Sequence, residues 1–186
     1  MSVLAIIVLM LNASAFAEVK DYLNLEIGYL SALESQSDFS QLNNTLFSSD
    51  PSGAVAECSY LITHQGTTSL VNLQTKLGIQ HFEISNQQNY SMGTVKIYNK
   101  QTSLSLGGRL LFSAFASVSV FAEAGFLMSL SQHGFLRSEV GTVAFTDWEV
   151  LFINAGFNFP LFDHYRIGFN THLFGTAVAL EVQYEI

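Results

Sequence analysis

The feature that most constrains this chain is an alternation of apolar and polar residues with a period of two. In residues 23–29, and again in residues 178–186, every second residue is apolar and those between are polar or small. Successive side chains of a β-strand point to opposite faces, so this period predicts strands with one apolar and one polar face. The pattern recurs from Tyr22 to Ile186, which predicts an all-β chain.

Turn residues divide the pattern into about eight strands. We expect them at 21–32, 54–64, 69–82, 93–112 (as 93–98 and 102–112 if it is broken), 118–131, a segment ending with 151–159, 165–174 and 176–186. The connections after the first, third and fifth strands are long and polar, at 33–53, 84–91 and 132–144. Those after the second, fourth and sixth are short, and so is the last one near Gly175.

The N-terminus has the pattern of a secretory signal. Val3 to Leu11 is an apolar run too short to span a bilayer as a helix. Ala15-Phe16-Ala17 then provides small residues for a signal peptidase. We therefore expect a signal peptide at 1–17 and a single mature domain at 18–186.

Composition narrows the class of protein. Hydrophobic residues make up 49% of the chain and charged residues only 12%, about half of what a soluble domain usually carries. The net charge of −8 argues against a nucleic-acid partner. The single cysteine, Cys58, excludes an internal disulfide.

The charges identify which face is inside. Six charged residues fall on the polar faces of the expected strands, and we predict that they form a polar network in the lumen: Glu26, Lys76, Arg109, Glu123, Arg166 and Glu181. The opposite faces would contact lipid through Leu23, Leu25, Ile27, Leu73, Leu77, Ile79, Leu104, Leu106, Ile153, Phe157 and Val182. Together with export, this predicts an eight-stranded antiparallel transmembrane up-and-down β-barrel.

Two other folds fit parts of the pattern. Residues 110–130 are nearly apolar and long enough for a membrane helix, although their Val, Phe and Ser favour strands. A soluble periplasmic barrel that binds an apolar ligand inside would show the same alternation with its faces reversed.

The chain resembles the small outer-membrane β-barrel family of OmpA-like and OmpX-like proteins. Three stretches carry the resemblance: residues 23–29, residues 120–126 and residues 179–186. It implies an outer-membrane location, lipid and lipopolysaccharide as surroundings, and insertion by the barrel-assembly machinery. The family's last strand normally ends in an aromatic residue, where this chain has Ile186. We therefore expect no peptidoglycan-binding domain of the kind that the longer relatives carry.

Function is predicted from what such a barrel exposes. Loops on a rigid scaffold commonly carry binding, so we expect a structural or adhesion-type role, with host or cell-surface ligands. Leu42, Leu46 and Phe47 would either contact a partner or fold back onto the rim. The alternatives are a narrow porin-like channel and a lipid-modifying enzyme, for which His172 with Glu181 is the only suggestive pair. We predict no catalytic residue, no metal site and no cofactor.

Overall fold

A computed structural model of the chain describes residues 16–30, 42–43, 45–66, 71–91, 93–115, 117–138, 141–145, 151–172 and 177–186. Residues 1–15 of the expected signal peptide and parts of the first and third expected loops lie outside these residues. The described strands are β1 (Phe16–Leu30), β2 (Ser52–Gly66), β3 (Val71–Tyr90), β4 (Gly93–Phe115), β5 (Val118–Ser138), β6 (Gly141–Phe145), β7 (Leu151–Phe162), β8 (Tyr165–His172) and β9 (Ala177–Glu185).

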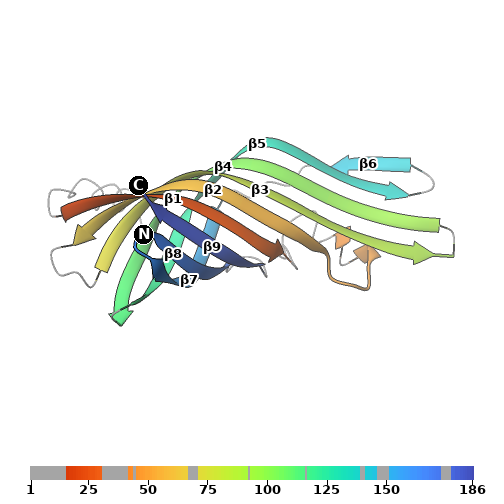
Figure 1. Ribbon diagram of the computed structural model, residues 1–186. Helices are drawn as coiled ribbons and strands as arrows, with labels where there is room; N and C mark the ends of the chain where they lie inside the picture. Colours follow the sequence, from red (N-terminus) through yellow and green to blue (C-terminus); the bar gives the residue numbers. More distant parts are fainter. Residues whose placement is uncertain are drawn as a thin grey trace.

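Eight of these strands form a closed ring. The order is β4-β3-β2-β1-β9-β8-β7-β5, and pairing of β4 with β5 closes it. All neighbours are antiparallel, and β6 lies outside the ring as a short hairpin partner of β5. Figure 1 shows the ring with its strands steeply tilted. The predicted eight-stranded antiparallel transmembrane β-barrel is confirmed.

The two faces of the ring differ as the alternation predicts. On β1, Asn24 and Glu26 point inward and are fully buried, whereas Leu23 and Ile27 are 48% and 59% exposed on the outside. Every residue that we expect to contact lipid lies on this outer surface, with Leu73, Leu104 and Ile153 half-buried among their neighbours. The barrel therefore has a polar interior and an apolar exterior, the reverse of a soluble barrel with an apolar cavity.

Residues 110–130 form no helix. They are the end of β4 and most of β5, which pair with each other, with Leu110 opposite Ala122. In the described residues, no helix has the length and apolarity needed to cross a membrane.

The expected loop at 84–91 is wrong. β3 continues without a break to Tyr90, and Asn89 pairs with Thr94 just before the turn into β4. The expected loop at 132–144 is also wrong, because β5 runs to Ser138 and β6 follows it. Beyond the bilayer both faces of a strand can be polar, so the hydrogen-bond ladder continues where the apolar alternation stops.

These long strands build a sheet that projects past the rest of the ring. We call it the extension: residues 81–90 of β3, 93–102 of β4, 131–138 of β5, and β6. In Figure 1 it reaches well to the right of β1, β2, β7, β8 and β9.

The inner side of the extension carries a small apolar core. It consists of Leu30, Phe47, Val55, Phe82, Ile84 and Ile97. Leu42 and Leu46 pack against this core. Of the two roles that we considered for Leu42, Leu46 and Phe47, the structure shows the second, in which they fold back onto the rim.

Candidate functional site

The barrel interior holds a cluster of fully buried charges. The Lys76 ammonium, from β3, lies 2.8 Å from Glu123 Oε1 on β5 and 2.8 Å from Glu57 Oε1 on β2. Glu57, Lys76 and Glu123 come from β2, β3 and β5, and the ring brings these three inward side chains together. A buried charge is tolerated when it is paired and hydrogen-bonded, as Lys76 is here.

Arg109, from β4, connects two further strands. Its Nε donates to Glu123 Oε2 at 2.6 Å. Its Nη1 and Nη2 donate to the two carboxylate oxygens of Glu181, on β9, at 2.7 and 2.8 Å. This two-point contact is the strongest geometry that a guanidinium and a carboxylate adopt. Glu123 thus lies between the two buried cations and joins them into one network.

Neutral side chains complete the network. Asn154 donates to Glu123 at 3.1 Å, and Ser105 donates to Glu57 at 3.1 Å. The aromatic rings of Phe152 and Phe121 lie 5.4 Å from the Lys76 ammonium and 3.9 Å from the Arg109 guanidinium, respectively. The interior at this level is therefore filled by side chains, as expected for a ring of eight strands.

Three glutamates lie side by side across neighbouring strands. Glu26 on β1 is directly opposite Glu57 on β2 and Glu181 on β9, and all three point inward. Like charges in such positions repel each other. The cations that offset this row, Lys76 and Arg109, contact its two ends through Glu57 and Glu181.

Arg166, the sixth residue of the expected network, lies apart from this cluster. Its Nη2 donates to Asn158 at 2.7 Å and to Ser119 at 3.2 Å, so its described partners are neutral. It borders a polar cavity of about 240 Å³ near the end of the barrel at which β1 begins and β9 ends. The other residues that line this cavity include Tyr22, Thr63 and Gln74.

Sequence reasoning missed Glu57. The second strand has the weakest alternation, because Val55 and Leu61 also point inward, whereas Ala54, Ala56 and Cys58 point outward. Hydropathy therefore does not distinguish the two faces of β2. The spacing of the polar residues could have identified Glu57. Glu57, Ser59 and Thr63 are separated by even numbers of residues, so on a strand they point to the same face.

The suggestive pair of His172 and Glu181 is not brought together. His172 is opposite Ala177, whereas Glu181 is opposite Gly168. Four residues along a strand are about 13 Å. Glu181 is also occupied by Arg109. The backbone register therefore does not place His172 and Glu181 opposite one another, as a catalytic pair on neighbouring strands would require.

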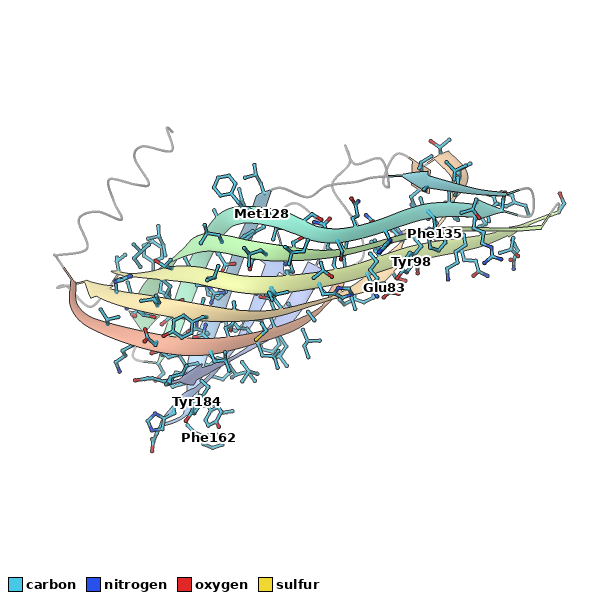
Figure 2. The ribbon with its side chains drawn as sticks, turned by 90° about the horizontal axis from the view of Figure 1, so that it is seen from above. Glu83, Tyr98, Met128, Phe135, Phe162 and Tyr184 are labelled. Atoms are coloured by element: carbon cyan, nitrogen blue, oxygen red, sulfur yellow. The ribbon has the colours of Figure 1, made fainter. Side chains whose placement is uncertain are left out.

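Aromatic residues gather at the end of the barrel where β9 finishes. The rings of Tyr165 and Tyr184 are 4.9 Å apart, and His164 approaches the Tyr184 ring edge-on. Figure 2 shows Tyr184 and Phe162 close together at this end. Such a girdle is typical of the level where a barrel meets the membrane–water interface.

The comparisons agree with this architecture. No family model matches the chain, and no curated protein matches it. Among solved structures, it is similar to Ail, the attachment invasion locus protein of Yersinia pestis, with 12% identity and a TM-score of 0.51 over 91% of this chain and 100% of that one. A designed transmembrane β-barrel has 9% identity and a TM-score of 0.44, over 90% of this chain and 95% of that one. Neisserial surface protein A has 9% identity and a TM-score of 0.43, over 91% and 97%. The chain therefore has the fold of the small outer-membrane β-barrels.

Proposed function

We propose that this chain is an outer-membrane protein of a Gram-negative cell, with the barrel as a closed scaffold and the extension as a surface-interaction module. The observation that carries the proposal is the extension itself. Three strands continue beyond the apolar exterior and are held by a core of their own, separate from the charged interior. A barrel that served only as an envelope component would not need such a projecting sheet.

Connection lengths support the orientation. At the end where β1 begins, the strands are joined by the short segments 67–70, 116–117 and 163–164. The extension and residues 45–51 of the long connection between β1 and β2 lie at the opposite end. Outer-membrane barrels keep short turns in the periplasm and long connections outside. We therefore place the extension outside the cell and the cavity beside Arg166 on the periplasmic side.

We also propose that residues 1–17 are a signal peptide removed on export. Mass spectrometry of the protein isolated from outer membranes should give a mature N-terminus at Glu18. A mature chain that retained the first residues would show that this assignment is wrong.

The charged interior favours a scaffold over a channel. We propose that Glu26, Lys76, Arg109, Glu123 and Glu181, with Glu57, close the lumen, since Lys76 and Arg109 lie fully buried across it. Arg166 contributes polar filling nearer the periplasmic end. Planar-bilayer recordings of the purified barrel should show no discrete conductance, and a stable open channel would contradict the scaffold role. The name of the similar barrel Ail, attachment invasion locus protein, is consistent with this preference.

Removal of the hairpin between β3 and β4 tests the surface role. Glu83 is directly opposite Lys100, so deletion of residues 83–100 and their replacement by Asn-Gly preserves the register below. A non-adherent Gram-negative strain that expresses the intact chain should bind cultured animal cells, and the shortened chain should not confer binding.

The matched control replaces Asp163-His164, the turn between β7 and β8, with Asn-Gly at the opposite end. Both variants should keep the faster gel mobility of an unboiled barrel. Binding that persists without the hairpin, in a barrel that remains folded, would overturn the surface role.

A further inference from the structure

The outer face of the extension is basic. Lys96 and Lys100 lie on β4, and their direct partners on β5 are Arg137 and His133. These side chains lie on the face opposite Ile97, which is buried in the apolar core. We call this face the basic patch.

Positive charge is concentrated on the basic patch, although the chain as a whole carries a net negative charge. The protein has seven lysines and arginines and a net charge of −8, and three of the seven are Lys96, Lys100 and Arg137. Among the described residues of this face the carboxylate is Glu83, which is opposite Lys100 and hydrogen-bonded to Tyr98. The patch therefore keeps an excess of positive charge, which is complementary to an anionic partner.

The patch continues the lipid-facing surface upward. Ile79, Leu104 and Met128 are side by side on β3, β4 and β5 and form an apolar row on the outside. The next outward row is His81, Thr102 and Ser131. Above Leu130, which is exposed at the bulge of β5, all three strands present polar residues in this row, as expected at the boundary of a bilayer. Lys100 is four residues beyond Leu104, or about 13 Å along the strand.

Two aromatic rings lie in the middle of the patch. Tyr98 and Phe135 stack with their centroids 5.0 Å apart and their planes at 29°. Figure 2 shows Phe135, Tyr98 and Glu83 in sequence across β5, β4 and β3. Aromatic rings of this kind are typical of the headgroup level. Beyond them, Lys96 and Arg137 border a surface hollow of about 390 Å³ with Gln87, Thr94 and Ser138.

We propose that the basic patch binds the phosphorylated sugar headgroup of a glycolipid in the outer leaflet, of the lipopolysaccharide class. The partner is argued from charge and from position. Phosphate groups attract lysine and arginine at a membrane surface, and the patch is on the side of the extension that faces the neighbouring lipid. A soluble ligand would more naturally meet the tip of the extension. This inference rests on the proposed outer-membrane location.

Binding to lipopolysaccharide by the full-length mature barrel, folded in detergent, tests the inference. The probe is purified lipopolysaccharide, with chemically dephosphorylated lipopolysaccharide and a soluble sulfated polysaccharide in parallel arms. In the variant K96Q/K100Q/R137Q the affinity for the phosphorylated form should fall by roughly tenfold to 100-fold. The affinity of the intact chain should also fall as salt is raised.

The matched control is K20Q, which removes a lysine at the periplasmic end, where Lys20 pairs with Glu185. It should bind like the intact chain. Equal binding by the triple variant, or equal binding of the dephosphorylated lipid, would overturn the inference. A preference for the soluble polysaccharide would overturn it as well and would identify a different partner. Cell fractionation separates the two proposals, because a barrel that reaches the outer membrane but ignores lipopolysaccharide contradicts only this one.

Discussion

At the scale of single residues, the packing of the barrel interior depends on a few close contacts around the buried cations. Lys76, Gly107, Gly125 and Phe152 are side by side on four neighbouring strands. A Cβ on Gly125 would lie 2.6 Å from the tip of the Phe152 ring and 2.3 Å from the Leu106 carbonyl oxygen. The two glycines thus leave room for the ring, which in turn reaches the Lys76 ammonium.

Gly125→Ala should therefore destabilise the barrel by about 2 kcal/mol, since the new methyl group meets backbone as well as the ring. Gly108→Ala is the matched control. The atom nearest to its Cβ is 3.9 Å away, so its stability should stay the same or rise slightly. Urea unfolding in detergent micelles, monitored by circular dichroism, measures the unfolding free energy of both variants. Equal losses of stability in the two variants would show that the close packing at Gly125 is unimportant.

Arg109→Met should cost about 3–5 kcal/mol of unfolding free energy, because Glu123 and Glu181 would remain buried without their shared cation. Arg166→Met should cost only about 1 kcal/mol, because the partners that it leaves are an amide and a hydroxyl. The same urea titration compares them. A milder effect for Arg109 than for Arg166 would contradict the central place of the Arg109 network.

At the scale of elements, the extension and the ring are stabilised by different forces. The ring is closed by hydrogen bonds all round and filled by polar side chains. Among the described residues, the extension is instead a sheet with unpaired edges that depends on one apolar core. Phe82 and Ile97 are central to that core and are almost fully buried. Local stability follows the density of such contacts.

Phe82→Ala should therefore loosen the extension and leave the ring intact. Hydrogen exchange of backbone amides should accelerate in residues 84–97 and stay slow in residues 104–110 of β4. The control is Phe157→Ala, on the lipid-facing side of β7, which should leave exchange in the extension unchanged. Faster exchange throughout the ring would show that the two parts are one cooperative unit.

Sequence reasoning located the strands well where lipid imposes alternation, and poorly where it does not. Residues 23–29 and 178–186 are predicted correctly because a residue that faces lipid must be apolar. Residues 84–90 are missed because water accepts polar side chains on both faces. Alternation along each strand predicts which charged side chains point into the barrel. It does not predict which of them pair, because pairing depends on the register between strands and no local sequence pattern specifies that register. This is why alternation alone groups Arg166 with the glutamates, and why it does not identify Glu57 as the partner of Lys76.

At the scale of the whole molecule, the single cysteine reports on how the barrel sits in the membrane. Cys58 is on the outer surface, directly opposite Leu25 and Ile79 in the apolar exterior. A charged maleimide should therefore fail to label it in membranes. In the variant C58S/S85C the thiol moves above the apolar rows to the outer face of the extension, and labelling should be fast on intact cells. Rapid labelling of Cys58 by the charged reagent would show that this side is not covered by lipid.

The contact between Arg109 and Glu181 has a consequence for biogenesis. Its two residues are separated by 72 positions, and the carboxylate comes from the final strand. A chain interrupted before β9 would leave Nη1 and Nη2 of Arg109 without the carboxylate that they bind, and β1 and β8 without the strand that pairs with both. The last strand therefore brings the two-point partner of Arg109 when it closes the ring between β1 and β8. Only a chain that includes β9 can therefore form both the closed ladder of strands and the two-point contact inside it.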